Sequence, residues 1–342
     1  MKIDKKTILQ TLIFTLAGIA LIVWRYQTLT KEDKDAMFRA FSAFRWEWAL
    51  PIFIAGLVSH ILRAKRWELQ FRALQIPSNS FNTFSAVMIG YLTNIFIPRL
   101  GEVSKCTVAA RYSGGAVDKI IGTVIAERLW DTICFGILTL LTLVIEADVM
   151  MPYASGILDT LLLKFRYPDG SFNWFKITVL TAVLFAGCVL LFFLFKKFRN
   201  GRIGGFIQGL GKGLQSVYKL PQKGLFLFYS IAMWGCYILV AVLVLKAIPA
   251  TEHLPLSAGL SIITFGTFAM IIPAPGAIAY PLIVAPVLTL YGTSAGVGQG
   301  YGWINWANQN ITVIILGLFA MIALPVYNSK NKRHDQIRNS AT

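Results

Sequence analysis

Long apolar runs limit the folds that this chain can adopt. A helix needs roughly 20 apolar residues to cross the hydrocarbon core of a bilayer, which is about 30 Å thick. Six runs approach that length and are spread along the whole sequence: 8–24, 49–62, 120–145, 177–195, 225–245 and 304–326. Only 14% of the 342 residues are charged, whereas soluble domains contain about a quarter. The sequence therefore predicts a single transmembrane domain, an all-α polytopic helical bundle with about six full spans.

Charge in the loops predicts the topology. Lysine and arginine favour the cytoplasmic side of a membrane, and basic residues gather at 63–72, 196–223 and 330–338, whereas the loop at 146–169 is acidic by comparison. We expect both termini in the cytoplasm and a location in the inner (plasma) membrane of a bacterial or archaeal cell. The formal charge of +16 then reflects loops that contact anionic lipids, and we expect no nucleic-acid partner.

Two further segments cannot be single crossings in this topology. Only one long run lies between the basic cluster at 63–72 and the acidic loop, so residues 80–119 must enter and leave on the cytoplasmic side. By the same reasoning residues 256–293 must enter and leave on the outer side. Each segment is interrupted by prolines and glycines, which end helices or allow sharp turns, so we predict two re-entrant broken-helix hairpins. These residues are Pro98 and Gly101 in the first hairpin, and Pro273, Pro275 and Gly276 in the second.

The two halves of the chain resemble each other. Ile97-Pro-Arg-Leu-Gly matches Ile272-Pro-Ala-Pro-Gly, and Glu127-Arg-Leu-Trp-Asp-Thr-Ile aligns with Asn305-Trp-Ala-Asn-Gln-Asn-Ile. Because the topology gives the halves opposite orientations, we predict an inverted repeat whose breaks meet near the midplane, as in many transporters. The predicted segments are a first helix and outer loop at 1–47, repeat one at 48–146, a connecting helix and basic cytoplasmic segment at 147–223, repeat two at 224–328 and a basic cytoplasmic tail at 329–342.

These motifs resemble those of a known family. Arg99-Leu-Gly101-Glu102 with Lys105, Glu127-Arg128-x-x-Asp131 and Pro273-x-Pro275-Gly276 are together similar to the flippase-like membrane family related to the transmembrane region of lysylphosphatidylglycerol synthases (multiple peptide resistance factors). The resemblance covers residues 63–324 and implies a plasma-membrane protein that moves or accommodates a charged lipid. The second half departs from the family, because no acid follows Gly276 and amides stand where the family tends to carry an arginine. No soluble acyltransferase domain follows residue 326, so we do not expect aminoacyl transfer by that route.

The span at 120–145 carries charges deep within its apolar run. Glu127, Arg128 and Asp131 lie about 12–18 Å beyond Lys119, near the centre of the bilayer, and share a broad helix face. Ionisable groups at this depth cost several kcal/mol unless they are paired. Two acids and one base require a further cation. The candidates on the first hairpin are Arg99, Lys105 and Arg111.

The charged residues fit two interpretations, a lipid-binding site and a structural clamp. The helix after the first break begins near Glu102, and its positive end favours an anion such as a lipid phosphate. The predicted substrate-binding residues are Arg99, Glu102, Lys105, Arg111, Glu127, Arg128 and Asp131, with Arg63, Arg66, Asn305 and Gln309 as further candidate headgroup contacts.

Three functions remain open. The first is a lipid flippase or transporter that binds an anionic or headgroup-modified (glyco)lipid. The others are a membrane transferase acting on a lipid-linked substrate and a scaffold that does not transport. The sequence contains no metal-ligand cluster, nucleophile–base arrangement or nucleotide motif, so we predict no metal and no cofactor. The expected partners are membrane lipids, anionic or lipid-linked, and a homo-oligomer is left open.

Overall fold

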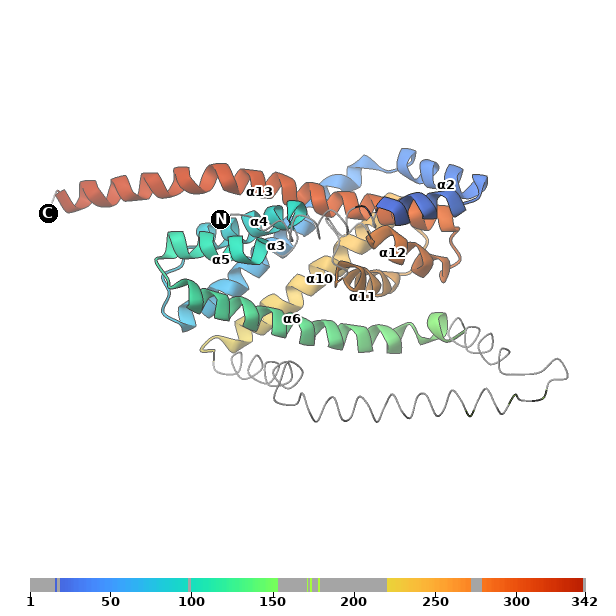
Figure 1. Cartoon of the computed structure of the whole chain (residues 1–342), viewed down its shortest axis with the longest axis horizontal. Helices are drawn as coiled ribbons and strands as arrows, with labels where there is room; N and C mark the ends of the chain where they lie inside the picture. The colour runs from blue at the N-terminus through green and yellow to red at the C-terminus, as the bar shows by residue number, and fades with distance from the viewer. Residues whose placement is uncertain are drawn as a thin grey trace. The chain divides into compact units, whose positions relative to one another are not determined.

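The computed structural model describes residues 19–97, 100–152, 220–271 and 279–340, with positions 16, 171, 173 and 178. Its elements in these ranges are helices, as Figure 1 shows: α2 (Lys31–Ser42), the short 3-10 helix η1 (Trp46–Trp48), α3 (Ala49–Ala73), α4 (Ser80–Phe96), α5 (Leu100–Ser113), α6 (Val117–Ile145), α10 (Lys223–Ala247), α11 (Ala258–Ile271), α12 (Tyr280–Thr289) and α13 (Ala295–Ser340). These helices confirm the predicted polytopic helical bundle.

Four helices in the described part are long and apolar enough to cross a membrane. They are Trp46–Ala73, Val117–Ile145, Lys223–Ala247 and Ala295–Ser329. Each contains one of the predicted spans. The other two predicted spans, 8–24 and 177–195, lie mostly outside the described residues, so the total of six remains a prediction.

The chain forms two compact units, residues 1–128 with 219–342, and residues 129–218. Helix α6 begins in the first unit and continues into the second. Most of the second unit lies outside the described residues, and this includes the connecting helix and most of the basic segment predicted at 147–223. The site described below lies in the first unit.

The first hairpin consists of α4 and α5, with 17 and 14 residues. At 1.5 Å per residue these helices are about 26 and 21 Å long, less than the thickness of a bilayer core. They pack against each other, with Gly90 and Gly101 at the contact, where a side chain on Gly101 would collide with the Gly90 carbonyl. The Gly101 N–H donates to Asn94 Oδ1 at 2.8 Å. The two arms are therefore joined at the break, whose residues Pro98 and Arg99 lie outside the described residues.

The second hairpin consists of α11 and α12, with 14 and 10 residues. Helix α12 lies along the N-terminal part of α13. This close packing depends on two glycines of α13, because Cβ atoms on Gly298 and Gly302 would lie 2.7 Å from Ala285 and Pro281 of α12. The predicted break residues Pro273, Pro275 and Gly276 lie outside the described residues.

Helices α3 and α10 pack along each other and connect the two halves. The larger apolar core is built on α10, where Ala241, Val244 and Leu245 are fully buried with residues of α11, α12 and α13. A second core joins α3, α4 and α5 to the first turns of α6, around Trp67 and Ile120. The charged residues of α3 and α6 lie beside this second core.

Helix α2 caps the start of α13. Figure 1 shows α2 beside the N-terminal part of α13. The Gly296 N–H donates to Asp33 Oδ1 at 2.9 Å, which satisfies one of the backbone donors that a helix N-terminus leaves unpaired. A side chain on Gly300 would meet Ala40 at 2.7 Å, so glycine is needed where the two helices touch.

Candidate functional site

The side chain of Glu127 is the centre of a buried charged cluster. It projects from α6 ten residues after the helix begins, which is about 15 Å along the helix, and it is fully buried. Three cations contact it. Lys105 Nζ lies 2.6 Å from Oε2, while Arg63 Nη1 and Arg66 Nη2 lie 2.7 Å and 3.4 Å from Oε1. The side chains of these cations are at most 7% exposed. We call these four residues the Glu127 cluster.

The cluster joins three helices of repeat one, because its cations come from α3 and α5. On α3, Arg63 and Arg66 lie three residues apart and share a face. On α5, Lys105 lies on the second arm of the hairpin. Of the hairpin cations predicted to approach Glu127, Lys105 does so, whereas Arg99 lies outside the described residues. Arg63 and Arg66, predicted only as further headgroup contacts, also reach it.

Aromatic and hydroxyl groups hold the cations in place. The Lys105 ammonium lies 4.0 Å from the centre of the Trp67 ring, a cation–π contact. Trp67 is itself fixed by a 2.8 Å hydrogen bond from its Nε1 to Thr123 on α6. Arg63 donates to the Tyr237 hydroxyl at 3.1 Å and Arg66 to Ser230 at 3.3 Å. Because both of these acceptors lie on α10, the second half of the chain also contributes to the cluster.

A second ion pair lies next to the cluster and is open. Arg128, adjacent to Glu127 on α6, pairs with Glu102 on α5. These side chains are 45% and 35% exposed, unlike the Glu127 cluster. Ionisable groups in a spanning helix typically pair with one another and face the bundle interior or a water-filled cavity. Helices α5 and α6 are thus joined twice, by one buried and one open ion pair.

The helix end predicted to attract a phosphate is already capped. Asn94 accepts the Gly101 N–H, and Glu102 occupies the first turn of α5. A headgroup would therefore meet the side chains of Lys105 and the two arginines rather than a bare helix terminus. The cation–carboxylate cluster is the stronger candidate for anion binding.

The remaining predicted residues are more scattered. Arg111 is exposed in the last turn of α5 and lies against the Tyr112 ring, 5.7 Å from its centre. Asp131 lies one turn beyond Glu127 on α6, in the second unit, and we do not assign it to the cluster. Asn305 is buried on α13, where it contacts Tyr280 and Tyr301. Gln309, one turn further, also reaches the Tyr280 hydroxyl.

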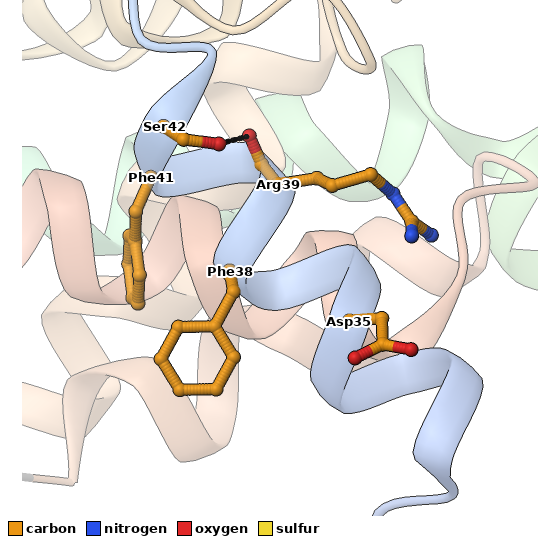
Figure 2. Close-up of a pocket in the computed structure, with 5 residues that line it drawn as sticks. All are labelled: Asp35, Phe38, Arg39, Phe41 and Ser42. Atoms are coloured by element: carbon orange, nitrogen blue, oxygen red, sulfur yellow. Dashed lines mark hydrogen bonds between the residues drawn. The ribbon is translucent and has the colours of Figure 1, made fainter.

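Two hollows lie elsewhere in the described part. An open one of about 660 Å³ lies on α2, where Figure 2 shows Phe38 and Phe41 on one side and Asp35 and Arg39 on the other. A smaller one of about 190 Å³ lies where the end of α3, the start of α4 and the end of α5 meet, lined by polar residues such as Asn82. Neither is lined by the Glu127 cluster.

Comparison with known proteins identifies the family. Residues 8–317 match the family model of the lysylphosphatidylglycerol synthase TM region. The chain belongs to this family. It is therefore a multi-pass membrane protein related to lipid-modifying and flippase-like proteins, as the sequence motifs predicted. No curated protein and no solved structure matches the chain.

Sequence reasoning missed several residues of this family member's site. Tyr237 and Ser230 lie in the apolar run at 225–245, and Trp67 lies in the basic cluster at 63–72. Their contacts with the cations arise only when α3, α5 and α10 pack. For Tyr280, the sequence does contain a pattern that could have predicted its place in the site. It lies seven residues after Pro273, as Lys105 lies seven after Pro98, so extending the alignment of the breaks pairs the two residues.

Proposed function

We propose that the protein binds an anionic or headgroup-modified lipid at the Glu127 cluster and moves the headgroup through the membrane core, as a flippase or lipid transporter does. The observation that carries this proposal is a buried carboxylate held by three cations in the middle of a spanning helix. Membership of a family named for a lipid synthase supports a lipid as the ligand. Anionic phospholipids carry the phosphate that such cations bind.

A lipid phosphate can share the donors that now hold Glu127. A phosphodiester carries one negative charge and presents two oxygen acceptors, as a carboxylate does, and arginine binds either group in a bidentate manner. When the phosphate takes Lys105 and one arginine, Glu127 keeps the other. No charge is then stranded in the membrane core, which would cost several kcal/mol.

The open ion pair supplies a path to the buried donors. A headgroup approaching between α5 and α6 meets Arg128 and Glu102 first, because these side chains are exposed while the cluster is not. Arg128 offers its guanidinium to the phosphate, and Glu102 can accept from an ammonium or a hydroxyl group. A headgroup held there lies one turn or less from Lys105 and Glu127 along the same two helices.

The test is translocation of a fluorescent phosphatidylglycerol in vesicles that contain the purified full-length protein. The variant Lys105→Met/Glu127→Gln removes one charge of each sign, so the net charge of the cluster stays the same, and Arg63 and Arg66 keep their hydrogen bonds to Tyr237 and Ser230 on α10. We expect its translocation rate to fall about tenfold or more, the effect of losing about 1.4 kcal/mol or more of binding.

The matched control is Arg45→Gln/Glu252→Gln, which makes the same charge change at a 2.7 Å pair whose side chains are 38% and 45% exposed. The control should translocate lipid as the native protein does. If the cluster variant is stable and also keeps the native rate, the cluster is a structural clamp and the proposed lipid site is wrong.

A further inference from the structure

The Glu127 cluster has an uncharged counterpart in repeat two. Lys105 lies seven residues after Pro98 and bonds to Glu127 at 2.6 Å. Tyr280 lies seven residues after Pro273 and bonds to Asn305 at 2.6 Å. The motif alignment pairs Glu127 with Asn305. In each half, therefore, the second hairpin arm is joined to the following spanning helix by one short bond between aligned side chains.

The first hairpin arms match as well. A glycine packs against the aligned side chain in both halves, eight residues before the break in one and seven in the other. A Cβ on Gly90 would lie 2.9 Å from the Cβ of Lys105, and one on Gly266 would lie 2.6 Å from the Tyr280 ring. The agreement of three positions on three helices indicates that the two junctions are the same structural site. The substitution of an amide and a phenol for a carboxylate and an ammonium makes the second one neutral.

The neutral junction keeps one buried acceptor available. The Tyr301 hydroxyl donates its hydrogen to the Ala241 carbonyl at 2.9 Å, so it can only accept from Asn305. Asn305 Nδ2 must therefore face both tyrosine hydroxyls, at 2.6 and 3.4 Å. This turns Oδ1 away from them, and Oδ1 is buried with no hydrogen-bond partner among the described residues. A buried acceptor left in this state is costly, and a donor from a ligand would satisfy it.

We propose that the Tyr280–Asn305 junction is a second ligand site, which binds an uncharged hydroxyl group of the lipid headgroup through Asn305 Oδ1. This inference rests on the proposed function, because it assigns the phosphate of the same lipid to the Glu127 cluster. Helix α10 contacts both sites, because Tyr237 and Ser230 accept from Arg63 and Arg66 and the Ala241 carbonyl accepts from Tyr301. Both junctions are closed in the structure, so the headgroup enters when the hairpin arms move. The ligand class is an anionic phospholipid with a hydroxylated headgroup.

The test compares two lipids that differ only in hydroxyl groups. Phosphatidylglycerol and phosphatidylpropanol carry the same phosphodiester and a three-carbon headgroup, but only the first has headgroup hydroxyls. Binding of each to the full-length protein is measured by native mass spectrometry in detergent. We expect phosphatidylglycerol to bind about fivefold more tightly, which corresponds to one hydrogen bond of ordinary strength. Equal binding of the two lipids to the native protein would overturn the inference, and no variant is needed for that result.

Variants locate the preference and separate it from the proposed function. Asn305→Leu keeps the size of the side chain and removes the acceptor, so it should bind both lipids at the phosphatidylpropanol level. Tyr280→Phe, which removes the group that orients Asn305, should reduce the preference about twofold or more. Asn310→Leu is the control, because Asn310 donates to the Trp306 carbonyl of its own helix at 2.7 Å, and it should keep the fivefold preference.

Lys105→Met tests the other site in the same assay. It removes one donor to the phosphate and leaves Glu127 paired with Arg63 and Arg66, so it should weaken the binding of both lipids equally and preserve the preference for hydroxyls. If Asn305→Leu keeps the preference, the second site is wrong while the first still stands. If Lys105→Met binds both lipids as the native protein does, the proposed function is wrong.

Discussion

The two hairpin junctions of this protein each join the second hairpin arm to the following helix by one bond of 2.6 Å, but one junction is charged and the other is neutral. In repeat one, α5 is joined to α6 by Lys105 and Glu127, with two further arginines on the carboxylate. In repeat two, α12 is joined to α13 by Tyr280 and Asn305, with Tyr301 as a neighbour. In both cases a glycine of the first hairpin arm lies against the aligned side chain of the second arm. Similar hairpin junctions can therefore be built from either charged or neutral groups.

The difference has consequences for how each junction responds to change. Ionic groups in a low-dielectric interior depend on their partners, because removal of one leaves the other charge uncompensated. A neutral hydrogen bond contributes less, and its loss strands no charge. The charged junction should therefore bind anions and be sensitive to single substitutions. The neutral junction should tolerate them and fix the geometry of the second hairpin.

Removal of the central acid should produce the largest effect. Glu127→Gln leaves three buried cations without their shared carboxylate, and breaking a buried pair in this way typically costs about 3–5 kcal/mol. We expect a large fall in the thermal unfolding temperature in detergent. Adding Lys105→Met should recover part of that loss, because one cation is removed as well. A single variant as stable as the native protein would contradict the contrast between the junctions.

Filling the glycine contacts should produce an intermediate effect. Gly266→Ala and Gly90→Ala each place a methyl group within 3 Å of the opposing arm, and overpacking of this kind typically costs about 1–3 kcal/mol. We expect the two variants to lose similar stability, because in each half the added methyl group meets the aligned side chain of the second arm. The measurement is the unfolding temperature of each variant in the same detergent. Loss in only one of them would show that the glycine positions are not equivalent.

Removal of the central amide should produce a smaller effect. Asn305→Leu loses the hydrogen bonds to two tyrosines but also removes a buried acceptor that has no partner in the described part of the chain. These changes oppose each other, so we expect a net loss of about 1 kcal/mol or less. The comparison with Glu127→Gln under identical unfolding conditions tests the difference directly. A loss as large as that of Glu127→Gln would refute it.

The smallest effect is expected at an exposed ion pair. Glu252→Gln removes the partner of Arg45 at a pair whose side chains are about 40% exposed, and such pairs contribute about 0.2–1 kcal/mol. This variant shows how much stability is lost when a carboxylate is removed outside the membrane core. A loss near that of Glu127→Gln would mean that burial does not explain the effect at the cluster.

The candidate site could be predicted in part from the sequence. Deep charges stand out in apolar runs because burying them is costly, and this identified Glu127, Arg128 and the hairpin cations. The partner of each charge was not predictable, because it depends on which helices pack together. The structure places Arg128 against Glu102 and surrounds Glu127 with Lys105, Arg63 and Arg66. Arg63 lies 64 residues from Glu127 along the chain, a separation that local pattern cannot bridge.

The class of fold, the four long apolar helices and the interruptions of the two hairpins follow from the sequence alone. These depend on apolar length and on proline and glycine, which act locally along the chain. The tertiary structure is needed to see that each break is followed by a junction between aligned side chains, ionic in the first half and neutral in the second. A hydrogen bond or an ion pair requires two side chains to meet at about 3 Å, and that meeting is set by the packing of α3, α5, α10 and α13 rather than by any one of them.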